Sequence, residues 1–290
     1  MASAFKQHLR LRLITLAILA GLLLLPAAIV RAEPRSAPSA PAVNLDLPAT
    51  LGRIVYQTPE PAARRIFIVA NGHRSALSGA NAANIVQAQL ETFRIGEWLI
   101  NRRQVGLLLP EGFFGAMAET PVDPAHTPPD NPSLRASLLD RSRFVNAELL
   151  LHRNYGICLE QVEDPALYRS ARENLRLSLF ADETVATRSR LELAGLQRRR
   201  TAAILQSAPA AIDKVLAQDG GAGGNAMLTI GLSHLDDIVA FLEAGAIDIA
   251  PLHTARVDFP AETSELELLK RQVGVTVIVP HSLVARLPRK

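Results

Sequence analysis

The stretch AMLTIGLSHLDDIVAFL, residues 226–242, joins an apolar run to a segment with helical periodicity. The run from Ala226 to Ile230 has the length and composition of a buried strand. Ser233 and Asp236 are spaced like a capping box, which starts a helix whose apolar face begins at Ile238. A strand followed at once by a helix is the repeating unit of parallel sheets, so this stretch predicts an α/β fold.

Similar apolar runs, each ended by turn residues, predict the other strands. They are Arg53 to Tyr56, Ile66 to Ala70, Val105 to Leu109, Gly156 to Val162 and Val273 to Val279. The segments between them predict helices around Val86 to Phe93, from Pro165 to Phe180 and from Ala186 to Ala217. This alternation predicts a largely parallel or mixed sheet flanked by helices. We expect a single α/β domain over residues 51–290.

The first 32 residues have the three parts of a secretory signal. A basic start precedes an apolar run from Leu13 to Val30, and Val30-Arg31-Ala32 resembles a cleavage site before Glu33. Residues 1–32 are therefore expected to be a signal peptide. The alternative is an uncleaved anchor in the inner membrane, because about 18 apolar residues approach the length of a spanning helix.

Positive charge before an apolar segment stays in the cytoplasm, so the domain is expected to face outward. It would be periplasmic or secreted after cleavage, or anchored and facing the periplasm. Residues 33–50 contain four prolines among Ala and Ser, which predicts an extended tether between the membrane and the domain.

The formal net charge of +3 originates in the N-terminal segment. Lys6, Arg10, Arg12 and Arg31 lie there without any acid, which leaves the mature chain with 27 basic and 28 acidic residues. A nucleic-acid partner is therefore not expected. Cys158 is the only cysteine, so neither an internal disulfide nor a thiolate metal cluster is possible.

Four polar residues follow predicted strands and are the main candidates for a site. His73 follows the strand ending at Ala70, and Glu111 follows the one ending at Leu109. Glu163 closes a third strand, and His234 follows a fourth. Ligands bind outside the carboxyl ends of strands in open α/β sheets, so these side chains are expected to converge. Imidazole and carboxylate groups suit a divalent metal, or the acid and base of a hydrolase.

Each of these residues also has a structural explanation when taken alone. His234 suits a helix cap, Glu111 suits a carboxylate that accepts backbone hydrogen bonds, and His73 suits an ordinary loop. The basic run Arg198 to Arg200 lies within a predicted helix, where a solvated face is the usual explanation. No G-x-S-x-G or H-E-x-x-H motif is present, so a serine hydrolase elbow and a zinc-peptidase helix are not expected.

The segment from Glu119 to Leu134 contains five prolines, which disfavour a helix or a central strand. It is expected to be a long loop. Such loops often cover a binding site, and the alternative is a surface insertion without a function.

These residues give the chain a resemblance to the TraB/GumN and Tiki proteins, and more loosely to the ChaN-like and erythromycin-esterase-like proteins. The chain is similar to that superfamily in a second Gly-x-x-His motif, which is Gly231-Leu232-Ser233-His234 here. Glu111 matches its strand-closing glutamate, and Arg199 or Arg200 its helical arginine. Its first Gly-x-x-His is replaced here by Asn71-Gly72-His73.

The resemblance implies a metal-dependent, peptidase-like or esterase-like site in one branch and haem binding in another. Our leading hypothesis is a cell-envelope hydrolase that acts on a small-molecule or peptide substrate. Its divalent ion, Zn, Mn or Co, would be held by His73, His234 and Glu111. Glu111 or Glu163 would act in catalysis, and Arg199 or Arg200 would stabilise developing negative charge. The alternative is a non-catalytic protein that binds haem or another ligand.

Overall fold

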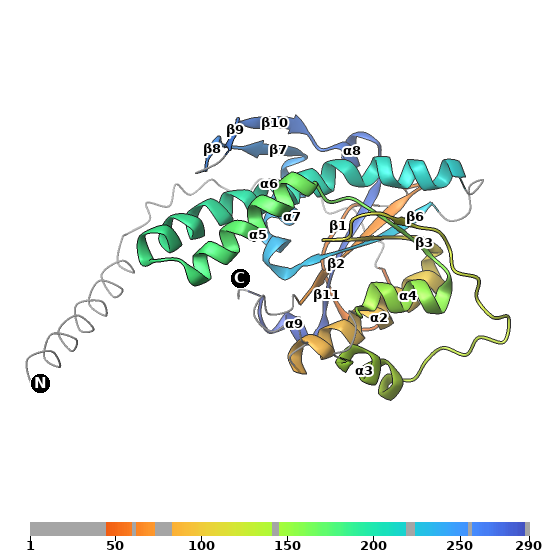
Figure 1. Cartoon of the computed structure of the whole chain (residues 1–290). Coiled ribbons are helices and arrows are strands. Elements are labelled where there is room, and N and C mark those ends of the chain that lie inside the picture. The colour runs from red at the N-terminus through yellow and green to blue at the C-terminus, as the bar shows by residue number, and fades with distance from the viewer. Residues whose placement is uncertain are drawn as a thin grey trace, which may run out of the picture. The chain divides into compact units, whose positions relative to one another are not determined.

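A seven-stranded mixed sheet forms the centre of the computed structural model, with helices on both faces (Figure 1). The structure describes residues 45–59, 62–72, 83–140, 145–218, 224–254 and 257–287. The expected signal or anchor, most of the tether and His73 lie outside these ranges. Within them, no helix has both the length and the apolar composition needed to cross a bilayer.

The strands of this sheet follow the order β1-β11-β2-β6-β3-β5-β4. Their bounds are β1 Gly52–Gln57, β2 Arg65–Asn71, β3 Val105–Pro110, β4 Ala116–Met117, β5 Cys158–Glu160, β6 Asn225–Gly231 and β11 Gly274–Pro280. The strands from β11 to β5 are parallel, whereas β1 and β4 pair in the antiparallel sense at the two edges. The predicted α/β class and the flanking helices are confirmed.

Alternate residues of β2 show how the sheet divides the core. Ile66 and Ile68 face one cluster of buried side chains, and Phe67 and Val69 face the other. All four are almost fully buried. A strand that is apolar on both faces needs cover on both sides, which the helices provide.

The helices α2 Ala83–Arg103, α3 Asn131–Leu139 and α4 Ala147–Tyr155 pack on the Phe67 face. The opposite face is covered by α6 Glu183–Gln218, α7 Leu235–Ala244 and α8 Glu267–Lys270. The remaining helical segments are α5 Pro165–Phe180, which lies against α6, the short turn η1 Leu232–His234, and α9 His281–Val284. Two small ribbons pair β7 Ala246–Ile249 with β10 Glu262–Glu265, and β8 Leu252–His253 with β9 Asp258–Phe259.

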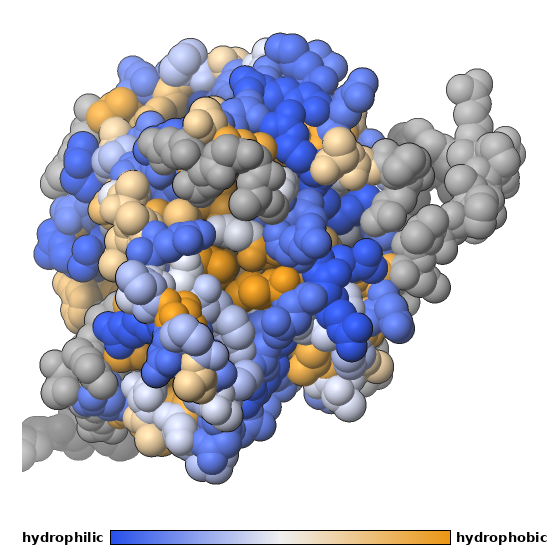
Figure 2. Space-filling view, turned by 90° about the vertical axis from the view of Figure 1, so that its right-hand side faces the viewer, coloured by the Kyte–Doolittle hydropathy of each residue, from blue (hydrophilic) through white to orange (hydrophobic). Residues whose placement is uncertain are grey.

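Hydrophilic side chains cover most of the surface seen in Figure 2, and hydrophobic ones gather in a hollow near its centre. The hydrophilic cover agrees with helices that bury one apolar stripe and expose the opposite side.

The structure differs from several of the expected elements. The strand expected from Gly156 to Val162 is limited to Cys158–Glu160. The last residues of the proline-rich segment start α3, because Pro132 lies in the first turn, where a missing N–H is tolerated. The capping box at Ser233 is wrong: α7 is capped by His234 without a side-chain hydrogen bond, since η1 precedes it. The packed core also begins earlier than residue 51, because Leu45 is buried.

Gly156 is a position where the fold requires glycine. It ends α4 with φ of 64°, and an added Cβ would lie 2.5 Å from the Thr120 carbonyl oxygen. Gly245 ends α7 with φ of 68°, but an added Cβ there would meet only the end of Leu269 at 3.8 Å. Alanine would therefore strain the backbone at both positions, but only at Gly156 would the added Cβ also clash with backbone atoms.

We expect Gly245→Ala to lower the free energy of unfolding by about 1 kcal/mol, the usual cost of a left-handed non-glycine residue. Gly156→Ala should cost about 2–4 kcal/mol, because the Thr120 backbone must also shift. Urea unfolding followed by circular dichroism measures both changes. Equal losses for the two variants would contradict the predicted clash.

Candidate functional site

The parallel strands β2, β6 and β3 end side by side at one edge of the sheet. Asn71 pairs with Gly231, and Pro110 with Thr229. The N–H of Glu111 donates to the Thr229 carbonyl at 2.8 Å, which extends this pairing one residue beyond β3. The residues that follow these strands therefore share one edge.

A cavity of about 270 Å³ lies at this edge. The strand ends contribute Asn71, Gly72, Glu111, Thr229, Ile230 and Gly231 to its lining, and the helices contribute Gln89, Asn146, Glu148 and Tyr168. Two carboxylates, Glu111 and the buried Glu148, thus face the same small space. Concave, polar and partly enclosed, the cavity is the best candidate for a reaction site among the described residues.

The Glu111 carboxylate is held at both oxygens. The N–H of Gly231 donates to Oε2 at 2.7 Å, and Nη2 of Arg200 donates to Oε1 at 2.7 Å. Nε2 of His234 lies 3.4 Å from the same Oε1. The side chain of Glu111 is only 9% exposed, so these contacts act with little screening by water.

Arg200 joins the two glutamates of the site. Its Nε and Nη2 donate to the two oxygens of Glu163 at 3.0 and 2.8 Å, while Nη2 also reaches Glu111. Nη1 donates to Gln197 at 2.7 Å, and the guanidinium lies 5.2 Å from the centre of the Tyr168 ring. All three nitrogens of the guanidinium therefore donate hydrogen bonds, and Nη2 holds Glu111 in place.

The charge of Arg200 is stable in this setting. Burial lowers the pKa of the guanidinium, but the hydrogen bonds that it donates to Glu163 and Glu111 and the negative charges of these glutamates outweigh burial and raise that pKa above its ordinary value. One cation thus faces two carboxylates, and the cluster has one negative charge in excess when both glutamates are ionised.

Thr201 fixes the tautomer of His234. Its hydroxyl donates to the Gln197 carbonyl at 2.9 Å, so the same oxygen accepts the 2.6 Å hydrogen bond from Nδ1 of His234. In the neutral ring Nδ1 therefore has the proton and Nε2 has the lone pair. This lone pair faces Oε1 of Glu111 at 3.4 Å, so the two atoms are placed to bind one metal ion together.

The structure brings together most of the residues expected at the site. Glu111, Glu163, Arg200 and His234 lie in one cluster. Arg199, the other arginine considered, lies elsewhere. Its Nη2 donates to the carbonyls of Ala250, Phe259 and Pro260, and burial lowers its pKa.

The fit to a metal ion is partial within the described residues. His234 and Glu111 present a nitrogen and an oxygen that are close enough to share one ion, with the tautomer a ligand needs. No group of three or more His, Cys, Asp or Glu side chains among the described residues has the geometry of a metal site. The third expected ligand, His73, lies outside these residues.

The proline-rich segment does not cover the cavity. Residues 119–130 contribute nothing to its lining. Instead, Thr120 bonds Nε2 of His152 at 2.9 Å, and Arg94 donates to the Pro129 carbonyl at 2.7 Å. The loop is therefore held against α2 and α4, which contradicts the expected lid.

Sequence reasoning missed Thr201, Gln197, Glu148 and Tyr168. Gln197, Arg200 and Thr201 are three and four residues apart, so they share a helix face, and this spacing is a signal that was available in the sequence. Glu148 lies in α4, a helix that was not predicted.

The chain was compared with protein-family models, curated proteins and solved structures. It matches no family model, no curated protein and no solved structure.

Proposed function

We propose that the cavity at the ends of β2, β6 and β3 is the active site of a metal-assisted hydrolase that cleaves an amide or ester bond. The observation that supports this best is the Glu111 carboxylate, which Gly231 and Arg200 orient while Oε1 faces Nε2 of His234. A buried carboxylate and an imidazole with fixed orientations are groups that acid and base catalysis uses.

Glu111 is the proposed general base. Its carboxylate lines the cavity, so it is placed to accept a proton from a water that attacks a substrate carbonyl. Glu148 lines the same cavity and is the candidate to return a proton to the leaving group. Arg200 is a positioning residue in this proposal, because its donors are already engaged with Glu111, Glu163 and Gln197.

His234 and Glu111 would hold a divalent ion, with His73 as the expected third ligand. The ion would supply Lewis-acid activation of the water and the carbonyl. The resemblance to the TraB/GumN and Tiki proteins supports the same assignment. The cavity of about 270 Å³ is smaller than typical cofactor pockets, so it does not favour the haem alternative.

We further propose that the single domain works outside the cytoplasm, on the basis of residues 1–32. N-terminal sequencing of the exported protein tests this location, because cleavage after Ala32 leaves Glu33 first.

Metal analysis tests the proposed site directly. The purified full chain, incubated with Zn²⁺, Mn²⁺ or Co²⁺ and desalted, is expected to retain about one equivalent of one of these ions. Excess ion should also stabilise the fold, by about 2.7 kcal/mol at a hundred times the dissociation constant. His234→Ala and Glu111→Gln are both expected to abolish the retained metal and the stabilisation.

His253→Ala is the matched control, because His253 is exposed and pairs with Asp258 at the surface. It should retain metal like the unmodified chain. If the unmodified chain takes up none of the three ions, the metal part of the proposal is wrong, and only the acid and base roles remain.

A further inference from the structure

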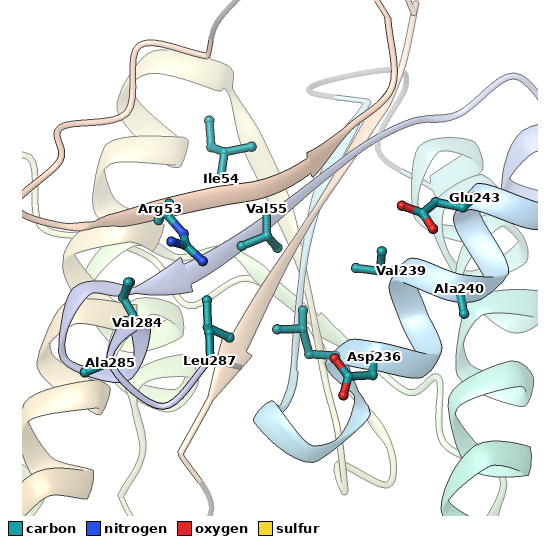
Figure 3. A pocket seen from close by; sticks show the side chains of 11 residues that line it. Arg53, Ile54, Val55, Asp236, Val239, Ala240, Glu243, Val284, Ala285 and Leu287 are labelled. Carbon is teal, nitrogen blue, oxygen red and sulfur yellow. The ribbon is translucent and has the colours of Figure 1, made fainter. Parts of the chain in front are cut away.

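A second cavity, of about 680 Å³, lies between β1, α7 and the end of α9 with the residues that follow it (Figure 3). It shares no lining residue with the cavity at the strand ends. Its volume is within the range of pockets that enclose small ligands. None of the roles proposed above uses it.

The walls of this cavity are largely apolar. Val55, Val239, Val284 and Leu287 line it, and each is a half-buried side chain that packs against the core on the α6 and α7 side. Figure 3 shows Val55 on the strand and Val239 on the helix with the open space between them. A ligand that fills this space would bury apolar surface on both sides.

Charges of opposite sign stand on opposite walls. Arg53 extends from β1 on the same side as Val55, and Glu243 extends from α7 across the cavity (Figure 3). Asp236 lies on the same helix as Glu243 and seven residues earlier, so both acids are on one face, about 10 Å apart. The side chains of Arg53, Asp236 and Glu243 form no hydrogen bond or ion pair with another described residue.

The negative charge of Glu243 acts on the neighbouring wall. Tyr56, whose hydroxyl donates to the Leu242 carbonyl at 3.3 Å, has its pKa raised by burial and by the charge of Glu243. Glu243 is itself exposed, as Arg53 and Asp236 are, so ion pairs with a ligand would form at the rim of the cavity and contribute modestly.

We propose that this cavity binds an apolar zwitterion, namely an apolar amino acid or a short peptide with both ends free. Its carboxylate would pair with Arg53, its ammonium with Glu243 or Asp236, and its side chains would lie on the valines and Leu287 between them. A purely anionic ligand such as a fatty acid would meet the two carboxylates, and a purely cationic one would meet Arg53. The proposal is independent of the hydrolase proposal, because it uses other residues.

Calorimetric titration of the full chain in mild detergent with leucine, dileucine and trileucine tests this assignment. At least one of the three is expected to bind. Acetylation of the amino end or amidation of the carboxyl end of that ligand should each weaken binding by about two- to fivefold, the range for exposed ion pairs. The ligand that binds best then distinguishes an amino acid from a peptide.

Substitutions of the cavity residues show which residue binds each end of the ligand. Arg53→Gln should weaken binding of the free ligand but not of the amidated one, whereas Glu243→Gln should weaken the free ligand but not the acetylated one. If the ammonium of the ligand pairs with Asp236 instead, Asp236→Asn is expected to show the result described for Glu243→Gln. Arg102→Gln and Glu119→Gln change exposed charges outside the cavity and should bind like the unmodified chain.

Three results would overturn the proposal. These are absence of binding by all three ligands at about 10 mM, equal binding of free and capped forms, and binding that is unchanged in every cavity variant. Circular dichroism of each variant excludes misfolding, and retained metal shows separately whether the strand-end site is intact.

Discussion

Replacing Arg200 by methionine is expected to lower the free energy of unfolding by about 3–5 kcal/mol, the cost of leaving a buried charge without its partner. The Arg200 side chain is 5% exposed and that of Glu163 is fully buried. Methionine fills part of the same volume, so the loss reports mainly on charge. Urea unfolding of the full chain, followed by circular dichroism, measures it.

Comparing the double variant of Arg200 and Glu163 with the two single variants distinguishes a stability loss caused by an uncompensated charge from one caused by poorer packing. If the guanidinium serves to neutralise Glu163, then adding Glu163→Gln to Arg200→Met should restore part of the lost stability, because one uncompensated charge is removed. A double variant that is as unstable as the sum of the two single variants would show that packing dominates.

Arg190→Met is the matched control on the same helix. Arg190 pairs with Glu183 at 2.7 Å, but the two side chains are 50% and 84% exposed. An exposed pair of this kind contributes about 0–1 kcal/mol. A loss for Arg200→Met no greater than that for Arg190→Met would contradict the role of Arg200 in the buried cluster.

The sheet was predictable because its strands are apolar on both faces. Runs such as Ile66 to Ala70 have no other favourable place than the interior, and the helices between them imply parallel pairing. The helices α3 and α4 were harder to predict. Pro132 resembles a helix breaker until its place in the first turn is known, and α4 is a short helix that packs on α2.

The site was predictable only where it depends on strand ends. Glu111, Glu163 and His234 each follow or close a strand, so the topology alone brings them near one another. The choice between Arg199 and Arg200 depends on distant contacts instead. Adjacent residues of a helix point about 100° apart, and both arginines are buried, one against the glutamates and the other against the carbonyls of residues 250–260.

Glu111→Gln is expected to lower hydrolysis by at least about 10²–10⁴-fold, because it removes the proposed general base and also one proposed ligand of the metal. Fluorescein-labelled casein and p-nitrophenyl acetate, each with Zn²⁺, Mn²⁺ or Co²⁺, provide amide and ester probes. Glutamine keeps an oxygen for Gly231 or Arg200 but loses the charge, and Arg200 keeps its bidentate pair with Glu163. The stability cost should therefore be about 1–3 kcal/mol, less than that of Arg200→Met.

This separation of activity from stability distinguishes a catalytic glutamate from a structural one. A purely structural Glu111 would lose stability and keep the turnover of the folded fraction. Glu111→Asp keeps the charge but withdraws it by one methylene, so it should lose activity by about 10²-fold while the pairing with Arg200 weakens. Glu119→Gln, an exposed change outside the cavity, should leave both hydrolysis and stability unaltered.

Unchanged hydrolysis by Glu111→Gln would remove the base from the proposed mechanism. An unmodified chain that cleaves neither probe with any of the three ions would count against the hydrolase itself, because the cavity would then hold Glu111 and Glu148 without reaction.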